Sequence, residues 1–473
     1  MRHTKIVATL GPATDPPEKL RKMFDAGVDV FRLNASHGVQ EDHARRIHAV
    51  RQLAKEMGRN AGILLDLQGP KIRLGTFVDG GCYLEDGAVF TITTHAVEGT
   101  CERACTGYSE FARDVKAGDP VLLADGAVQL EVLTTDGIAA RCKVVHGGRI
   151  SDRKGINLPG VKISTPSLSK KDAADAHFAV EQGVDFIALS FVRTGKDVMR
   201  LRHLLDEVDA RQPIVAKIEK PEAFQNLDSI LEEADGVMVA RGDLGVEMPL
   251  EKVPMMQKAI IERTRQYGKF VITATQMLES MIENPLPTRA EVSDIANAIY
   301  DGTSALMLSA ETSTGKYPIE SVKMMSKIAV ETESAVRGQG FKEVQLISEL
   351  TTPHIVADAA YHAARSAGVS ALVVGTTSGA TARLLARYRP PVPVYAFTSD
   401  ERVARELSIV YGVEAIVAPA SESTDEMLFG MEQRLIKSGC VRPGQSVVFV
   451  AGQPVNQPGS TNMLKLHMVS AHE

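Results

Sequence analysis

Short apolar runs alternate with longer amphipathic segments through most of the chain, and this alternation limits the fold more than any other feature. The segments between the apolar runs, such as Pro17–Asp25, Asp197–Val208 and Glu251–Gln266, have the spacing of helices. Repeated strand–helix units are typical of a parallel sheet covered by helices, and eight of them indicate a (β/α)8 TIM barrel. The predicted strands are Ile6–Leu10, Val28–Leu33, Gly62–Leu67, Asp185–Ser190, Ile214–Ile218, Gly236–Ala240, Phe270–Ala274 and Ser304–Leu308.

A long insertion separates the third and fourth predicted strands. It spans about 115 residues, far more than an ordinary connection inside a compact domain. The inserted segment is rich in Gly, Thr and Val and has turn signals such as Ala124-Asp125-Gly126, which are typical of short antiparallel strands. We therefore predict a small β-barrel lid domain at residues 71–168, inserted into a catalytic barrel domain formed by residues 1–70 and 169–345.

Residues 346–473 repeat the strand–helix pattern on a smaller scale. A helix is predicted at Ile355–Ala367, and strands are predicted at Ser370–Val374, at Val394–Phe397 and near Val447–Val450. This order is typical of an open α/β domain, which we predict to be regulatory.

Composition and charge exclude several classes of protein. With 44% hydrophobic and 24% charged residues, the chain fits an ordinary globular enzyme rather than a disordered protein. The 53 basic and 59 acidic side chains give a net charge of -6, so no basic field points to nucleic acid or to an anionic membrane. The chain has no apolar run near the ~20 residues of a membrane span, and its five scattered cysteines do not suggest a disulfide framework. We expect a cytoplasmic enzyme without nucleic-acid or membrane partners.

Reactive side chains gather where the predicted barrel strands end, which is where barrel enzymes carry their active sites. Polar residues at so many strand ends are too costly to be packing accidents. These residues are Arg32, Asn34, Ser36, His37, Asp66, Ser190, Lys217, Glu219, Lys220, Arg241, Asp243, Thr275, Gln276, Ser309 and Glu311.

The types of these residues indicate metal-assisted chemistry on an anionic substrate. Glu219 and Asp243, on neighbouring predicted strands, could hold a Mg²⁺ ion, or each could pair with a nearby Lys or Arg. Lys217 and Glu219 alternate along one strand and so point the same way, which sets an ammonium beside the metal, where it suits an enolate or phosphoryl oxygen. Otherwise Lys217 is a structural ion-pair partner. Arg32 and Arg73 can each grip a phosphate, although lone arginines are usually surface residues.

Several long segments closely resemble pyruvate kinase, and they occur in the same order along nearly the whole chain. They are Phe31–Gly38, Ile218–Lys220, Val239–Gly245, Ala274–Met281 and Pro287–Glu291. The resemblance implies the architecture described above and transfer of a phosphoryl group from phosphoenolpyruvate to ADP, giving pyruvate and ATP. It also implies Mg²⁺ as cofactor, with Mn²⁺ as a substitute, and a homotetramer.

The resemblance also implies roles for individual residues. The catalytic residues would be Lys217, Arg32 and Thr275, and the Mg²⁺ carboxylates would be Glu219 and Asp243. The residues that contact phosphoenolpyruvate would be Arg32, Lys217, Ala240, Arg241, Gly242, Asp243 and Thr275, with backbone amides holding its carboxylate. The residues that contact the nucleotide would be Asn34, His37, Arg73 and Lys154.

One departure from the family concerns its monovalent cation. The family usually needs K⁺, held by residues that match Asn34, Ser36, Asp66 and the carbonyl of Leu67. Potassium-dependent members carry a Glu after the Gly-Pro of the strand-three loop, whereas this chain has Lys71. A fixed ammonium there can supply the charge that K⁺ supplies elsewhere, so we predict activity without K⁺. The alternative is that Lys71 is a lid-surface lysine.

A second candidate site lies in the C-terminal domain. A polar loop follows a predicted strand and opens a helix, an arrangement that can cradle phosphate. In the family that this chain resembles, the loop binds a phosphorylated allosteric effector, and Gly452–Thr461 resembles the facing loop. The alternative is a polar turn with a helix cap. The predicted effector-binding residues are Thr376, Thr377, Ser378, Gly379 and Thr381.

Two other functions compete with the kinase. The first is a Mg²⁺-enolate barrel enzyme such as an aldolase or lyase acting on pyruvate, but such an enzyme needs no lid for ADP. The second is a non-catalytic sensor of phosphorylated metabolites that has kept the fold and lost the chemistry. The presence of Lys217, Glu219, Asp243 and Thr275 argues against the sensor.

Overall fold

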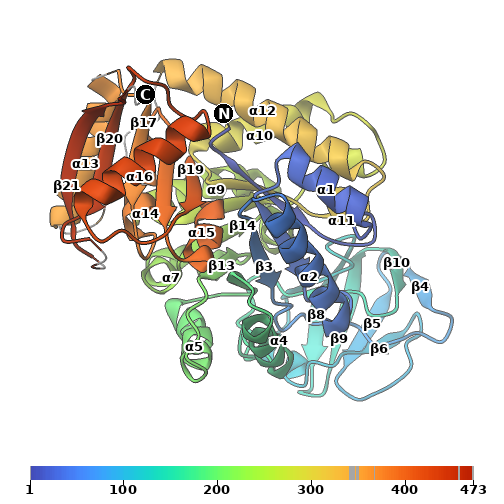
Figure 1. Ribbon diagram of the computed structural model, residues 1–473. Coiled ribbons are helices and arrows are strands. Elements are labelled where there is room, and N and C mark those ends of the chain that lie inside the picture. The colour runs from blue at the N-terminus through green and yellow to red at the C-terminus, as the bar shows by residue number, and fades with distance from the viewer. Residues whose placement is uncertain are drawn as a thin grey trace.

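The computed structural model describes residues 2–339, 347, 351–366, 368–455, 457 and 459–470. Eight parallel strands close into a barrel in the order β1-β16-β15-β14-β13-β12-β3-β2 (Figure 1). The TIM-barrel prediction is confirmed, and each predicted strand end agrees with the structure to within two residues. The strands are β1 (Lys5–Thr9), β2 (Val30–Asn34), β3 (Gly62–Asp66), β12 (Phe186–Leu189), β13 (Ile214–Ile218), β14 (Gly236–Ala240), β15 (Phe270–Ala274) and β16 (Ala305–Leu308).

Helices connect successive strands and cover the outside of the barrel. Their ends follow local sequence signals, since Ser169 and Thr288 begin two of them with capping boxes and Gly27 ends α1 in the left-handed conformation. None of the helices in the described ranges is long and apolar enough to cross a membrane. The helical elements of this domain are α1 (Pro17–Ala26), α2 (Gln40–Glu56), α4 (Lys170–Glu181), α5 (Gly195–Asp206), α6 (Pro221–Gln225), α7 (Leu227–Glu233), α8 (Arg241–Glu247), η1 (Leu250–Lys252), α9 (Val253–Gln266), η2 (Glu279–Ile282), α10 (Arg289–Asp301), α11 (Ala310–Ser313) and α12 (Pro318–Gln339).

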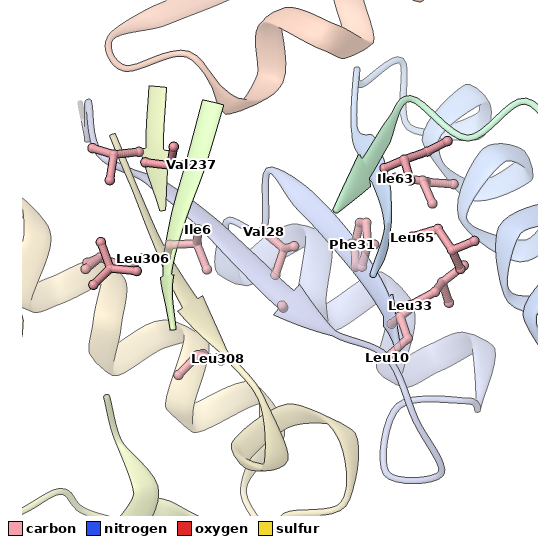
Figure 2. Packing of buried hydrophobic residues seen from close by; sticks show 14 of the residues in the cluster. Ile6, Leu10, Val28, Phe31, Leu33, Ile63, Leu65, Val237, Leu306 and Leu308 are labelled. Carbon is pink, nitrogen blue, oxygen red and sulfur yellow. The ribbon is translucent and has the colours of Figure 1, made fainter. Parts of the chain in front are cut away.

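Alternate residues of the barrel strands belong to two separate hydrophobic clusters. Phe31 packs in the layer between strands and helices (Figure 2), whereas Val30 and Leu64 belong to a cluster that fills the barrel and reaches the C-terminal domain. Because side chains alternate along a strand, Arg32 and Asp66 continue the inward-facing rows of Val30 and Leu64. The apolar pattern therefore aims these two charges into the carboxyl end of the barrel.

The insertion between β3 and β12 is built of short strands, as predicted, with one short helix, α3 (Phe111–Asp114). Six strands form a sheet in the order β11-β7-β8-β9-β5-β6, and β4 pairs with β10. Figure 1 shows this lid in pale blue, on the other side of the barrel from the C-terminal domain. The strands are β4 (Gly81–Leu84), β5 (Val89–Thr93), β6 (Arg103–Cys105), β7 (Pro120–Leu123), β8 (Val128–Thr135), β9 (Ala139–His146), β10 (Gly148–Ser151) and β11 (Ile156–Asn157).

The C-terminal domain is an open sheet in the order β19-β18-β17-β20-β21, as the predicted α/β class requires. The predicted strands correspond to β17, β18 and β20, whereas β19 and β21 at the sheet edges were not predicted. The predicted boundary between residues 345 and 346 lies outside the described residues, and so does Ala367 at the end of the predicted helix. The elements are α13 (Thr352–Ser366), β17 (Ala371–Gly375), α14 (Ala380–Ala386), β18 (Val394–Thr398), α15 (Glu401–Glu406), η3 (Leu407–Ile409), β19 (Val413–Val417), α16 (Thr424–Lys437), β20 (Ser446–Gly452) and β21 (Thr461–Met468).

Candidate active site

Arg32 is held at the carboxyl end of the barrel by partners on two neighbouring strands. Its Nε and Nη2 atoms lie 2.8 and 2.7 Å from Asp66 Oδ2, and Nη1 donates to Thr9 Oγ1 at 2.9 Å. The side chains of Arg32 and Asp66 are 9% and 1% exposed. A charge-assisted contact this deeply buried fixes the orientation of the guanidinium.

Lys217 is the centre of the charged cluster. Its Nζ lies 2.7 Å from Ser190 Oγ, 2.7 Å from Glu219 Oε1 and 3.3 Å from Asp66 Oδ1. Burial opposes its charge, yet Asp66 and Glu219 raise the pKa of Lys217 above its ordinary value. Burial also opposes an ionised Asp66, but Lys217 and Arg32 lower the pKa of that carboxyl below its usual range. The site therefore holds a fixed ammonium beside a fixed carboxylate.

Glu219 and Asp243 are two acids close enough to affect one another. Glu219 is 1% exposed, and its Oε2 accepts a hydrogen bond from the Phe191 amide at 2.8 Å. Burial and the charge of Asp243 raise the pKa of Glu219, although Lys217 opposes this. Carboxylates that repel one another in a buried site fit a Mg²⁺ ion, whose charge favours the ionised form. No group of three or more metal-ligating side chains occurs in the described part of the chain, so water and substrate would complete its shell.

Thr275 is presented by a strained turn at the end of β15. Its backbone φ is 70°, in the left-handed region that β-branched residues rarely occupy. Its Oγ1 donates to the Ala274 carbonyl at 2.6 Å and accepts from the Gly242 amide at 2.8 Å. The Arg241 side chain is bound to Asp294 at 2.7 Å, so its backbone is the part left for the predicted substrate contact. The Gly242 amide, predicted to face substrate, already has Thr275 as its acceptor.

The predicted nucleotide-binding residues lie on two domains, the barrel and the lid. Asn34 ends β2, and His37 is exposed on the loop that follows it. Arg73 and Lys154 lie together on the lid, because Arg73 bridges to Gly155 and the Leu74 amide donates to the Lys154 carbonyl at 2.8 Å. A nucleotide between these two groups would therefore contact both the barrel and the lid.

Four of the five predicted monovalent-cation positions lie near the ends of β2 and β3. Asn34 and Asp66 are paired in register, and Asn34 Oδ1 accepts from the Ser36 amide at 3.0 Å. The Leu67 carbonyl accepts from Ser190 Oγ at 2.8 Å. The strand register thus brings these oxygen atoms to one edge of the barrel mouth.

Lys71, the fifth position, extends toward the lid. Its Nζ lies 3.8 Å from Asp125 Oδ1, and its Cε packs against Gly155. Asp125 is a lid residue with a 73% exposed side chain, so this ion pair is weak. The structure does not bring the ammonium to Asp66, and the replacement of K⁺ by Lys71 stays a prediction.

The predicted effector loop lines a cavity of about 610 Å³ in the C-terminal domain. Gly379, with a φ of 76°, forms a left-handed turn in the loop just before α14. The hydroxyls of Thr381 and Thr461, which both line the cavity, are 2.7 Å apart. Arg434 of α16 also lines the cavity, and sequence reasoning missed it because nothing in the sequence brings α16 to this loop. Four of the five predicted effector residues line the cavity, Thr376, Thr377, Ser378 and Thr381, whereas Gly379 is not among its lining residues.

Ser190 is the cluster member that sequence reasoning left without a role. It contacts Lys217 and the Leu67 carbonyl, and its Oγ lies 3.5 Å from Asp66 Oδ1. The available signal was its place at the end of the fourth predicted strand, two residues after the inward-facing Ala188. This parity would have directed its hydroxyl into the barrel mouth.

Comparisons with known proteins agree over nearly the whole chain. The family description "Pyruvate kinase, barrel domain" matches residues 1–322, and "Pyruvate kinase, alpha/beta domain" matches residues 354–467. The chain is 46% identical over 477 residues to a pyruvate kinase of Geobacillus stearothermophilus, a match that covers 99% of this chain and 81% of the relative. It is 44% identical over 475 residues to that of Staphylococcus epidermidis, with the same coverage. The solved structure of a pyruvate kinase from Cryptosporidium parvum superposes with a TM-score of 0.93 at 35% identity, covering 99% and 96% of the two chains.

Proposed function

The chain belongs to the pyruvate kinase family and has that enzyme activity, and from this premise we propose how its residues perform it. The reaction is Mg²⁺-dependent transfer of the phosphoryl group of phosphoenolpyruvate to ADP, followed by protonation of the enolate of pyruvate. The observation that carries the proposal is the buried group of Arg32, Asp66, Lys217 and Glu219, in which two carboxylates hold two cations at the carboxyl end of the barrel. The family assignment rules against the aldolase and the sensor.

Arg32 and Lys217 neutralise the charge that moves during transfer. Arg32, oriented by Asp66, contacts the phosphoryl group, and Lys217 stands beside the enolate oxygen that the departing phosphoryl group leaves behind. Because both cations are fixed before the substrate arrives, little reorganisation is needed at the transition state. The chemistry is therefore positioning and charge neutralisation rather than covalent catalysis.

Glu219 and Asp243 would hold the Mg²⁺ ion, which would supply positive charge to the substrate oxygens when bound. Thr275 lies beside the substrate carboxylate, where its hydroxyl is already oriented by Ala274 and Gly242. The backbone at Ala240 and Arg241 would face the same carboxylate, whereas the Gly242 amide donates to Thr275 Oγ1. Arg73 and Lys154 bind the nucleotide phosphates from the lid. Closure of the lid excludes the water that would compete for the phosphoryl group.

Activity without K⁺ is a further part of the proposal. Its support is the presence of Lys71 in the loop after β3, although the ammonium contacts Asp125 in this structure. Initial rates in tetramethylammonium buffer free of K⁺ and Na⁺ test it. Retained activity in the wild type and a loss in Lys71→Ala are expected, and collapse of the wild-type rate without K⁺ would contradict it.

We also propose a phosphorylated allosteric effector in the C-terminal cavity and a homotetramer. The cavity is supported by loop hydroxyls and by Arg383 and Arg434 on its wall. The tetramer is supported by exposed apolar side chains on two domains, such as Leu250, which is 73% exposed, and Met468 of the edge strand β21, which is 66% exposed. Sedimentation equilibrium checks the assembly, and a single species of about 51 kDa would contradict it.

The experiment that tests the Mg²⁺ assignment is a titration of activity with a chelator. Pyruvate formation from phosphoenolpyruvate and ADP is expected to stop when Mg²⁺ is removed and to return when it is restored. Asp243→Asn is expected to lower the affinity for Mg²⁺ by at least tenfold, so that a higher Mg²⁺ concentration is needed for half-maximal activity, as is usual when a ligand or its support is lost. An unchanged Mg²⁺ requirement in this variant would overturn the assignment.

A further inference from the structure

A buried polar contact joins the lid to the barrel next to the proposed metal carboxylates. Asn157 Nδ2 of β11 donates to Glu247 Oε1 at 3.1 Å, and Lys220 Nζ lies 3.1 Å from the same oxygen. The side chains of Lys220 and Glu247 are only 5% and 4% exposed. Removing either ion would leave a buried charge uncompensated, so the pair holds a single arrangement.

The sequence positions of Lys220 and Glu247 make this pair part of the metal-carrying framework. Lys220 directly follows Glu219 at the end of β13. Glu247 lies four residues after Asp243 in α8, so both acids occupy one face of that helix. The ion pair therefore ties the end of β13 to α8, the two elements that carry the proposed Mg²⁺ carboxylates.

Asn157 extends this tie to the lid. It follows Lys154 by three residues, and β11 pairs with β7, so the backbone of Asn157 moves with the lid sheet. Asn157, Lys220 and Glu247 line one wall of a cavity of about 30 Å³ that Lys71 also borders. Pro70 and Ser167, from the two connections between the lid and the barrel, line the same cavity.

We propose that Asn157 is a positioning residue, whose hydrogen bond to Glu247 sets the lid and Lys154 at the distance from the metal carboxylates that the nucleotide phosphates require. The inference rests on the proposed function, since it takes the lid as the carrier of the nucleotide-binding cations. Phosphoenolpyruvate binds on the barrel side of the site. The contact therefore governs capture of ADP and leaves binding of phosphoenolpyruvate unaffected.

The test compares three variants of the full-length enzyme. Asn157→Ala removes the donor and leaves the Lys220–Glu247 pair in place, so KM for ADP is expected to rise about tenfold, the usual size for a hydrogen bond to a charged group. The Kd for phosphoenolpyruvate, measured by calorimetry without nucleotide, is expected to stay within twofold. Asn157→Gln keeps the amide donor beside a cavity that has room for its extra methylene, and it is expected to restore most of the ADP affinity. Lys143→Ala, at an exposed site on β9, is the matched lid control and is expected to behave as wild type.

Two results would overturn the inference while leaving the proposed function intact. One is a KM for ADP within twofold of wild type in Asn157→Ala, and the other is an equal loss of phosphoenolpyruvate binding, which a merely structural role predicts. Should Asn157→Ala not fold, Asn157→Asp replaces it, because its carboxylate is isosteric and repelled by Glu247; the same KM criteria apply. A wild-type enzyme that forms no pyruvate from phosphoenolpyruvate, ADP and Mg²⁺ would remove the proposed function, and this inference with it.

Discussion

Neighbouring residues fix the orientation and the charge of the side chains in the site. Arg32 is oriented by Asp66, and Lys217 keeps its charge because two carboxylates face it inside the barrel. The sequence predicts which residues gather here, because the two-residue period of the strands sets their direction. It does not predict that Thr275 would sit in a strained left-handed turn, since that conformation depends on contacts from distant residues.

The hydroxyl of Thr275 provides the first prediction. Thr275→Val keeps the volume and removes the only acceptor that the structure gives the Gly242 amide, whereas Thr275→Ser keeps the oxygen. We expect kcat to fall about 100-fold in Thr275→Val, the usual cost of losing a preorganised polar contact, and less than tenfold in Thr275→Ser. Steady-state kinetics measure both, and equal losses in the two variants would show that the hydroxyl is not the group that matters.

The cysteines of the lid provide the second prediction. Burial and its interaction with Cys101 raise the pKa of Cys82 to about 12, and burial raises the pKa of Cys142 to about 12. Because the thiolate is the nucleophile, iodoacetamide at pH 8 is expected to alkylate the exposed Cys101 at least tenfold faster than Cys82 or Cys142. Peptide mass spectrometry over time measures the rates. Modification of Cys82 as fast as Cys101 would contradict this.

At the scale of elements, strands buried on both faces were the easiest to predict. The bounds of β13, β14 and β15 match the prediction, because nearly continuous apolar runs mark strands inside a parallel barrel. The edge strands β19 and β21 were missed, since exposed and polar residues break their pattern. The pairing order of the lid strands could not be predicted either, because it depends on contacts between segments far apart in the chain.

The third prediction concerns the pH dependence of stability and rests on His43 of helix α2. Burial lowers the pKa of His43, and Arg46 lowers it further. The unfolded chain therefore binds a proton at His43 at about pH 6.5, a higher pH than the folded chain requires. As the pH falls below that value, protonation favours the unfolded chain and the unfolding free energy decreases. Replacing His43 with Leu is expected to flatten the fall in unfolding free energy between pH 7 and 5. Urea denaturation at several pH values measures it, and an unchanged slope would refute it.

At the scale of the whole molecule, the C-terminal domain is bound to the barrel through a buried carboxylate. Asp185, with a 1% exposed side chain, is 2.7 Å from Arg51 of α2 and 2.8 Å from Arg405 of α15. Its Oδ2 also accepts from the Ile63 amide at 2.8 Å. This one carboxylate therefore joins two barrel elements to the domain that carries the proposed effector cavity. The sequence marks Asp185 only as the first residue of a strand and gives no sign of these partners.

The fourth prediction follows from that junction. Asp185→Ala would leave two arginines without their common partner, and the unfolding free energy is expected to fall by about 3 kcal/mol. Arg405→Ala is expected to cost less, because Arg51 and the Ile63 amide still satisfy Asp185. Guanidinium denaturation followed by circular dichroism compares them. A loss below about 1 kcal/mol in Asp185→Ala would show that the junction contributes little.

The central claim is that the Lys217 cluster performs phosphoryl transfer from phosphoenolpyruvate to ADP, and one coupled assay tests it. ADP-dependent pyruvate formation is measured in Mg²⁺ buffer for the wild type and for Lys217→Ala, with phosphoenolpyruvate binding followed in parallel. The wild type is expected to turn over, and Lys217→Ala is expected to lose at least 100-fold in kcat while it still binds phosphoenolpyruvate. A wild type that binds phosphoenolpyruvate without forming pyruvate, or a Lys217→Ala enzyme with undiminished kcat, would contradict the account.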